Sequence, residues 1–221
     1  MDVIEAIKTR QSVRAYKPDP VPAEVIEEIL DVAVYSPSAM NTQPWEFTVV
    51  AGEPLDKIRQ DNVKSLLAAG KDVLTFNYTG VYRERQVDLA KQLFKLMDIK
   101  REDKEKRMEW LKRGFRYFDA PAAIIVSMDR SLEERTWGIF DLGVVTQTIC
   151  LAALKHGLAT CIEDQGVIFH DVIREHTGLP ETKTPVIGIA VGYPDWEFPA
   201  NKLVREREKV ENLTTWCGFE K

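Results

Sequence analysis

The chain is predicted to fold as one domain of the α/β or α+β class, with helices on both sides of a sheet. Helix-like segments alternate with short apolar runs typical of strands along all 221 residues. No internal repeat or low-complexity linker interrupts this alternation. The length suffices for one substantial core, and 44% hydrophobic with 29% charged residues is ordinary for a globular protein. We therefore expect residues 1–221 to form a single domain.

The first 70 residues supply two amphipathic helices, a strand and a third helix. In the second helix, Ile26, Ile29, Leu30 and Ala33 recur at helical spacing opposite acidic residues. Pro22 suits the first position of that helix, because its missing N–H has no partner there. The predicted elements are helix 2–9, helix 22–36, strand 47–50, a turn at 52–54 and helix 54–67.

The remaining elements include two apolar runs, 122–128 and 185–193, that are typical of strands buried on both faces. Residues 138–156 are apolar nearly all round, which predicts a central buried helix. Gly157 follows as its left-handed cap. The other predicted elements are helices 83–97, 102–114 and 172–177, and a strand at 159–162.

Two segments depart from this pattern. Residues 70–118 combine many aromatic side chains with dense charge, and their turn-like part carries Tyr78 and Tyr82. Those two rings either cover a pocket or pack in the core. Residues 196–221 lack a core of their own yet carry apolar side chains, which need a surface to cover them. A partner subunit is the natural surface.

Bulk properties exclude several classes of protein. The net charge of −5 and the pI near 5.4 argue against nucleic-acid binding. No apolar run approaches 18 residues, so no membrane span is expected, and the N-terminus lacks the pattern of a secretory signal. Three cysteines without CxxC spacing fit a reducing cytoplasm, and Cys161 is expected to be a buried, inert thiol.

Three motifs carry the candidate chemistry. Residues 37–45, PSAMNTQPW, place hydrogen-bonding groups beside flat apolar surface, which suits a planar ligand with polar edges. Residues 10–14, RQSVR, alternate so that Arg10, Ser12 and Arg14 share one side of an extended segment. Arg205 and Arg207 repeat that spacing. Such arginines suit a phosphate, although solvated surface arginines have the same pattern.

Other kinds of site find no support. Neither GxGxxG nor GxxxxGK[ST] occurs, so a phosphate would have to be held by arginines. The GxSxG elbow and HExxH are also absent. No metal site is expected, because the three histidines, His156, His170 and His176, lack ligand spacing. No pair of carboxylates stands out for acid–base work.

The order of motifs resembles the nitroreductase-like family of FMN-dependent oxidoreductases. The resemblance rests on RQSVR, PVPAEVIEEIL, SPSAMNTQPWEFTVV, GIFDLGVVTQTICLAALKHGLATC and PVIGIAVGYPD. The segments YRERQ, FRYFDAPAAIIVSMDR and GLATC look most like the nitroaromatic-reductase branch. The resemblance implies an α+β fold, a three-layer α/β/α sandwich around a mainly antiparallel sheet. It also implies a homodimer with FMN at the subunit interface, a helical lid at 70–118, and a C-terminal arm, 196–221, on the partner.

The resemblance further implies roles for individual residues. Residues 10–12 (Arg10, Gln11 and Ser12) would bind the FMN phosphate and ribityl chain together with Arg205 and Arg207, and Arg14 would lie near the pyrimidine edge. Ile162, Glu163 and Asp164 would pass the flavin, with a backbone N–H of Glu163 or Asp164 reaching N5. The remaining implied contacts are Pro37, Ser38 and Asn41 on the partner's flavin, Gln43 and Trp45 at the interface, and Tyr78, Tyr82 and Arg83 over the substrate.

The implied activity is hydride transfer from NADH or NADPH, by a ping-pong cycle, to a nitroaromatic, a quinone or an activated alkene. Reductive dehalogenation, flavin fragmentation and non-catalytic flavin sensing remain alternatives. The branch often has Pro-Gln where this chain has Ile162 and Glu163. A carboxylate of Glu163 facing the pocket would disfavour anionic substrates such as nitrobenzoates. The sequence leaves the physiological acceptor, the choice of nicotinamide cofactor and the sensitivity to oxygen open.

Overall fold

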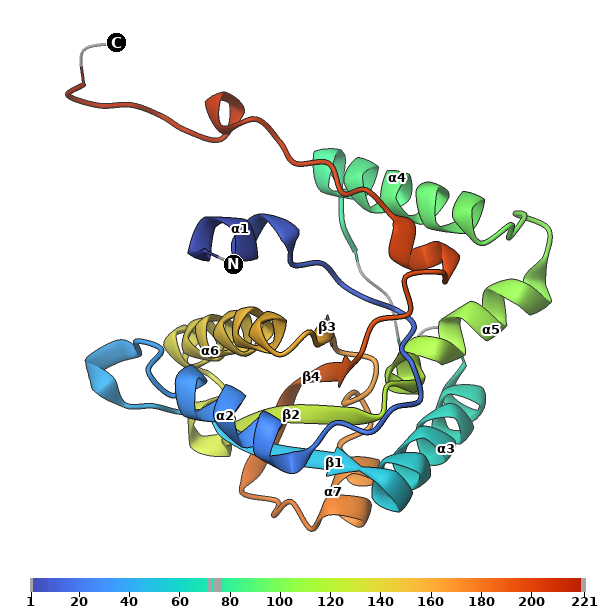
Figure 1. Cartoon of the computed structure of the whole chain (residues 1–221), viewed down its shortest axis with the longest axis horizontal. Helices are drawn as coiled ribbons and strands as arrows, with labels where there is room; N and C mark the ends of the chain where they lie inside the picture. Colours follow the sequence, from blue (N-terminus) through green and yellow to red (C-terminus); the bar gives the residue numbers. More distant parts are fainter. Residues whose placement is uncertain (1, 71–72, 74–76, 220–221) are drawn as a thin grey trace.

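The computed structural model describes residues 2–70, 73 and 77–219 and is built around a four-stranded sheet (Figure 1). The strands are β1 (Glu46–Ala51), β2 (Ala122–Asp129), β3 (Ala159–Glu163) and β4 (Lys183–Gly192). Their order is β1-β2-β4-β3, and every neighbouring pair is antiparallel. The mainly antiparallel sheet implied by the family resemblance is therefore present.

Helices cover both faces of the sheet. The helices of the described residues are α1 (Val3–Thr9), α2 (Ala23–Ala33), α3 (Gly52–Ala69), α4 (Gly80–Leu96), α5 (Lys104–Phe115), α6 (Thr136–Lys155) and α7 (His170–Thr177). Short 3-10 turns occur at η1 (Ala39–Asn41), η3 (Tyr117–Asp119), η4 (Arg130–Leu132), η5 (Pro199–Lys202) and η6 (Val210–Asn212). Helices α2 and α6 pack on one face, and α3 and α7 pack on the other.

Strand β2 connects the two layers, because successive side chains of a strand point to opposite faces. Ile124 and Val126 pack with α2 and α6, whereas Ala123 and Ile125 pack with α3 and α7. All four are fully buried. The continuous apolar run is thus explained by burial on both faces, and the three-layer α+β architecture is confirmed.

The extended segment 10–16 continues the sheet beyond β3. Ser12 forms a parallel bridge with Thr160, and the N–H of Val13 donates to the Thr160 oxygen at 3.0 Å. Tyr16 pairs with Pro194 in the antiparallel sense, and the N–H of Lys17 donates to Tyr193 at 2.8 Å. The N-terminal segment is therefore fixed to both β3 and the chain after β4.

Helix α4 lies away from the sheet, beside the root of the C-terminal arm (Figure 1). A small separate core joins them: Leu93 of α4 packs with Ala200 and Leu203, next to Trp110 and Phe198. Beyond η6 the arm runs out from the body of the chain (Figure 1).

Helix α6 was predicted to be central and buried, and the structure corrects this in part. Its inner face packs on the sheet, but Trp137 and Phe140 are 68% and 67% exposed. By length and composition α6 would also suit a membrane span, with a mean hydropathy of 1.5, and 44% of that window is buried inside the chain. Its packing on α2 and the sheet is that of a core helix with one uncovered face.

Most element boundaries differ from the predictions by a few residues, and three of the differences change the role of a residue. Pro22 precedes α2 as its cap rather than opening the helix. Helix α3 begins at Gly52 directly after β1, so residues 52–54 are its first turn. Helix α4 begins at Gly80 rather than at residue 83, which places Tyr82 on a helix instead of in a turn.

Candidate functional site

The site begins with the alternation of residues 10–15. Val13 and Ala15 are buried in the chain, whereas Arg10, Ser12 and Arg14 line a large open cavity of about 990 Å³. Pairing with β3 holds the segment extended, so every second side chain reaches the cavity. The predicted common side of the two arginines and the serine is confirmed.

The C-terminal arm brings the second arginine motif to the same cavity. Arg205 donates a hydrogen bond to the carbonyl oxygen of Arg10, which joins segments 195 residues apart in sequence. Arg205 is half-buried, and Arg207 is exposed. Both line the cavity together with Arg10 and Arg14.

Helix α4 forms the opposite wall, with residues that the sequence reasoning missed. Arg85, Asp88, Leu89 and Gln92 line the cavity. They recur at i, i+3, i+4 and i+7 and form one helix face, a pattern that was visible in the sequence. Lys209, Glu208, Asn212 and Leu213 of the arm were missed as well.

Positive charge predominates in this cavity. Of the described lining side chains, six are Lys or Arg and three are Asp or Glu. One of the acids, Glu208, is already bound to Arg85 at 2.7 Å and to Asn212 at 2.7 Å. The arrangement leaves the four arginines of the two motifs without a matching set of carboxylates.

The arginine cluster has the properties of an anion site. Burial and the nearby charges of Arg10, Arg207 and Arg14 lower the pKa of Arg205. The Nε atoms of Arg10 and Arg205 are buried and lack a hydrogen-bond partner. Buried donors without partners cost free energy, and a phosphate in the cavity would accept hydrogen bonds from the guanidinium groups that line it and reduce the repulsion among the cations. The residues present therefore fit the phosphate of FMN.

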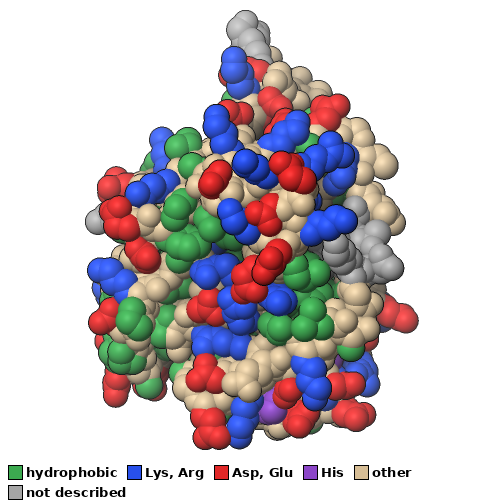
Figure 2. Space-filling view, turned by 90° about the vertical axis from the view of Figure 1, so that its right-hand side faces the viewer, with side chains coloured by type: hydrophobic (Ala, Val, Ile, Leu, Met, Phe, Trp, Pro, Cys, Tyr) green, Lys and Arg blue, Asp and Glu red, His purple; other side chains and the backbone are tan. Residues whose placement is uncertain are grey.

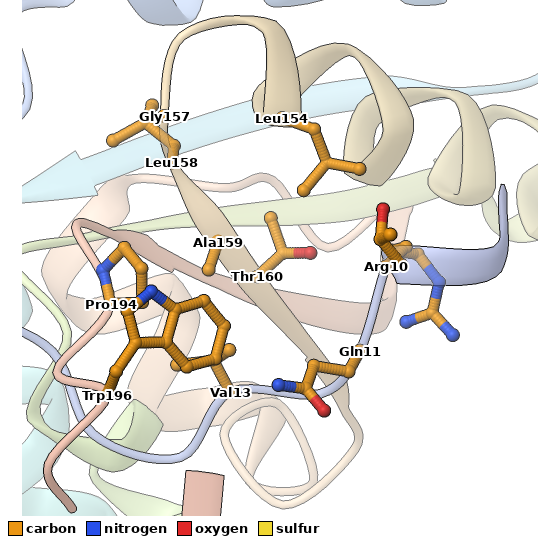
Figure 3. A pocket seen from close by; sticks show the side chains of 11 residues that line it. Arg10, Gln11, Val13, Leu154, Gly157, Leu158, Ala159, Thr160, Pro194 and Trp196 are labelled. Carbon is orange, nitrogen blue, oxygen red and sulfur yellow. The ribbon is translucent and has the colours of Figure 1, made fainter. Parts of the chain in front are cut away.

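Gln11 does not share this cavity. Its side chain faces a smaller, mainly apolar cavity of about 260 Å³, with Trp196, Leu154 and Leu158 (Figure 3). Figure 3 shows the Gln11 amide near the Trp196 ring while the Arg10 guanidinium points away. The amide also donates to the Asn201 carbonyl oxygen at 3.2 Å. The side chain of Gln11 therefore lies outside the arginine cavity, and its implied contact with the cofactor stays a prediction.

Glu163, at the end of β3, turns its side chain into the layer of α3 and α7. It is 8% exposed, and its Oε2 accepts from the N–H of Gly166 at 2.7 Å. Burial raises the pKa of this carboxyl to about 8. The carboxyl thus lies neutral beneath the strand at pH 7 and outside the arginine cavity. The expectation that Glu163 excludes anionic substrates required a carboxylate facing the pocket, and the structure does not place one there.

Close backbone approach makes room for this carboxyl and for the buried ring of Tyr117. A Cβ on Gly166 would lie 2.4 Å from Glu163 Oε1 and 2.4 Å from Tyr117 Cζ. Gly188 on β4 is similarly crowded, at 2.9 Å from the same ring. Tyr117 donates its hydroxyl to the Gly166 oxygen at 2.9 Å. The loop that follows β3 is therefore fixed by the hydrogen bonds of Gly166 with Tyr117 and Glu163.

The loop at 37–43 lies away from the arginines within one chain. Ser38 Oγ accepts from the N–H of Gln43 at 2.9 Å, and Gln43 donates to the Asn41 oxygen at 3.3 Å. The loop is tied to α6 because Ala39 donates its N–H to Asp141 at 3.1 Å. Pro37, Ser38, Asn41 and Gln43 do not line the arginine cavity.

Other predicted residues lie elsewhere. Trp45 is 7% exposed and packs in the main core, and its role at a subunit interface stays a prediction. Tyr78 and Tyr82 are 50% and 65% exposed, and Arg83 donates to Gln86 at 2.6 Å. None of these lid candidates lines the arginine cavity. The half-buried Ile162 and Asp164 flank Glu163.

Asp61, Glu175 and His176 form a separate cluster between α3 and α7. Their possible ligand atoms lie within 4.8 Å of one another. The histidine Nε2 is 2.7 Å from Asp61 Oδ2. This contact joins α3 to α7.

Comparison with known proteins identifies the family. Residues 7–193 match the model of the nitroreductase family. The chain belongs to the nitroreductase family. The match extends from the end of α1 to the residue after β4, and so includes the first arginine motif, the loop at 37–43 and the end of β3.

Relatives of this family align over nearly the whole chain. Nitrobenzene nitroreductase of Ectopseudomonas oleovorans is 33% identical, over 96% of this chain and 95% of its own. 4-Nitrobenzoate reductase of Pseudomonas putida is 31% identical, over 100% and 97%. The crystal structure of the FMN-dependent nitroreductase NfnB from Mycobacterium smegmatis, in complex with NADPH, has a TM-score of 0.88 at 26% identity and covers 97% of each chain.

The buried carboxyl yields a pH prediction. Because the pKa of Glu163 rises from about 4.5 in the unfolded chain to about 8 on folding, the folded state holds the proton more tightly. The free energy of unfolding should therefore fall as pH rises from about 5 to 8, by at most about 1.4 kcal/mol per pH unit from this group. Glu163→Gln should remove that decrease. Urea unfolding at pH 5, 6.5 and 8 measures it.

Glu109→Gln is the matched control. The hydrogen bond from Arg116 lowers the pKa of the Glu109 carboxyl, so this carboxyl is already ionised at pH 5. The Glu109→Gln substitution should therefore leave the change in the free energy of unfolding between pH 5 and 8 as it is in the wild type. Parallel curves for the wild type and Glu163→Gln would contradict the neutral state of the buried carboxyl.

Proposed function

We propose that this protein is an FMN-dependent NAD(P)H oxidoreductase that reduces nitroaromatic compounds. The observation that carries the proposal is the convergence of RQSVR and the Arg205–Arg207 motif on one cavity, with two guanidinium nitrogens buried and unpartnered. This occurs in a chain of the nitroreductase family. Relatives at 31–33% identity are named as reductases of nitrobenzene and 4-nitrobenzoate.

The arginine cluster would hold the FMN phosphate. Arg10, Arg205 and Arg207 would supply the charge, and Ser12 would supply a hydroxyl. Arg14, two residues further along, would lie by the flavin pyrimidine, where a fixed cation stabilises the reduced state. Ile162, Glu163 and Asp164 would pass the ring, with backbone N–H groups as donors toward N5.

The chemistry requires little more from the protein than binding and orientation. FMN supplies hydride transfer, from NADH or NADPH to a nitroaromatic, a quinone or an activated alkene. The chain would contribute positive charge at the phosphate and the backbone after β3 along the ring. The hydrogen bonds from Gly166 to Glu163 and from Tyr117 to Gly166 hold that backbone. A dedicated general base is not needed for hydride transfer, which agrees with the sequence.

The active unit would be a homodimer. Apolar side chains of α1 and α6 remain exposed in the single chain, including Ile4 at 57% and Ile139 at 47%. On the arm, Leu213 and Phe219 are 66% and 70% exposed. Such surfaces mark interaction sites. In a dimer, the loop with Pro37, Ser38, Asn41 and Gln43 would reach the partner's FMN.

The assembly also assigns roles to the two unusual segments. Residues 196–221 would form an arm on the partner, while 70–118 would form the substrate lid with Tyr78, Tyr82 and Arg83. On the face shown in Figure 2, acidic and basic side chains are intermixed. Such mixing agrees with small-molecule rather than nucleic-acid partners.

The phosphate assignment predicts the effect of removing arginines. Arg10→Gln and Arg205→Gln should each weaken FMN binding by roughly 10–100-fold, because each loses a charge-assisted hydrogen bond worth about 1.5–3 kcal/mol. Riboflavin, which lacks the phosphate, should be affected far less. Fluorescence titration of apoprotein with each flavin measures both constants.

Arg130→Gln is the control, since Arg130 is a half-exposed arginine paired with Glu133. It should leave both constants unchanged. If the Arg10→Gln and Arg205→Gln variants bind FMN as tightly as the wild type, the arginine cluster is not the phosphate site.

The proposed turnover has two half-reactions that can be measured separately: reduction of the flavin by the nicotinamide and its reoxidation by the acceptor. Anaerobic NADPH or NADH should bleach the flavin absorbance of the holoprotein, and nitrobenzene or 4-nitrobenzoate should restore it. Double-reciprocal plots at several donor concentrations should be parallel, as a ping-pong cycle requires.

The alternatives give different outcomes in the same assay. Failure of both nicotinamides to bleach the flavin would favour a flavin-binding sensor. Faster turnover of a halophenol with halide release than of any nitroaromatic, quinone or enone would favour a reductive dehalogenase. Loss of the isoalloxazine ring itself would indicate flavin fragmentation.

If the exposed face of α6 lies in the dimer interface, a charge placed on that face should prevent dimerisation. Phe140→Glu should yield a folded monomer with weaker FMN binding, because a charge would be placed in the proposed interface. Analytical ultracentrifugation measures the oligomeric state. Leu67→Glu, at a position on α3 that is 59% exposed, should remain dimeric. A wild-type protein that is monomeric at micromolar concentration would refute the assembly.

A further inference from the structure

The peptide groups of residues 14 and 15 are held by side chains from two distant elements. The N–H of Arg14 donates to Asn201 Oδ1 at 2.7 Å, and its carbonyl oxygen accepts from Arg113 Nη2 at 3.0 Å. Both polar groups of Arg14 are thus satisfied by side chains rather than by a neighbouring strand. Elsewhere in segment 10–16, Ser12 forms an isolated bridge with Thr160 of β3, and Tyr16 forms one with Pro194 after β4.

Asn201 is the centre of this arrangement. It lies in η5, is 3% exposed, and donates from Nδ2 to the oxygens of Ala15 at 3.0 Å and Asp195 at 2.7 Å. Its own carbonyl oxygen accepts from Gln11 at 3.2 Å. One amide therefore bonds to both sides of the junction between the N-terminal segment and the chain after β4.

Arg113 of α5 forms the second contact. Its guanidinium lies 4.8 Å from the Phe198 ring centroid and 3.2 Å from Asp119. Burial lowers the pKa of this arginine, with the nearby Asp119 opposing that effect. A costly half-buried cation is thus placed where it bonds to the Arg14 carbonyl.

The register of this segment decides which side chains reach the cavity. In an extended segment, a shift by one residue exchanges the two faces. Such a shift would turn Arg10, Ser12 and Arg14 toward the core and bring Val13 to the cavity. Fixing the Arg14 peptide therefore fixes the direction of every arginine in RQSVR.

Asn201 also lies four residues before Arg205. Ala200 and Leu203, on either side of it, are buried against Leu93 of α4. The root of the arm is thus anchored, and Arg205 reaches back to the Arg10 carbonyl. The same anchor sets the positions of both arginine motifs.

We propose that Asn201 and Arg113 are positioning residues for the phosphate site: they clamp the Arg14 peptide and thereby hold the arginines of the two motifs at the spacing that a phosphate needs. Neither side chain would touch the cofactor. The proposal rests on the phosphate assignment made above and adds the residues that make the cluster rigid. Pre-organised donors bind an anion more tightly because less ordering accompanies binding.

The test compares two flavins in apoprotein that remains folded. Asn201→Ala should lower the ratio of the riboflavin dissociation constant to the FMN dissociation constant by about tenfold. The matched control is Asn62→Ala, because Asn62 is also fully buried and its Nδ2 donates to the oxygens of Phe115 and Gly166. That variant should lower the urea midpoint similarly and leave the ratio of the two constants unchanged.

A second pair of variants guards against misfolding of Asn201→Ala. Arg113→Lys retains the charge but loses the guanidinium contact with Arg14, and it should lower the ratio by a factor of a few. Arg174→Lys is its control, since Arg174 donates in the same way to the Lys183 oxygen at 3.0 Å on the far side of the sheet. It should leave the ratio unchanged.

The outcomes separate the two proposals. If Arg10→Gln lowers the ratio while folded Asn201→Ala and Arg113→Lys do not, the clamp is refuted and the phosphate site stands. If Arg10→Gln also leaves the ratio unchanged, the phosphate assignment itself fails. A fall of the same size in Asn62→Ala would show a general effect of destabilisation and would overturn the clamp.

Discussion

The pairing of the N-terminal segment with the edge of β3 is the constraint on which the rest of the site depends. The hydrogen bond from the Val13 N–H to Thr160 places a short extended segment beside the sheet. Val13 is then fully buried, so the neighbours on either side of it must point outward. The alternation of side chains along this segment therefore places Val13 in the core and its neighbours Ser12 and Arg14 in the cavity. A free N-terminal segment would do neither.

Much of the fold could be predicted because its signals are local. The apolar run at 122–128 and the spacing of Ile26, Ile29 and Ala33 specify burial directly, and the structure places them in one core. Residues on the uncovered face of α6 could not be assigned in this way. Phe140 is as apolar as a core residue, and the sequence does not say whether its own chain or another covers it.

The site was predictable to the extent that its chemistry repeats in the sequence. Arg10, Ser12 and Arg14 could be found from their alternation, and Arg205 from the same spacing. Gln11 was assigned from the resemblance of RQSVR as a whole, and the alternation that places its neighbours in the cavity turns it to the other side. Asn201 carries no local signal, because its bonds are to backbone groups that are up to 187 residues away.

The distance between the arginine cavity and the loop at 37–43 within one chain has a thermodynamic consequence. If the loop contacts the cofactor of the partner, each FMN binds to groups from two chains, and binding must favour the dimer. By linkage, dimerisation must then favour FMN binding by the same free energy. The hydrogen bond from Ala39 to Asp141 ties this loop to α6, whose uncovered face is the proposed interface. One helix would therefore both join the subunits and place the loop that completes the neighbouring site.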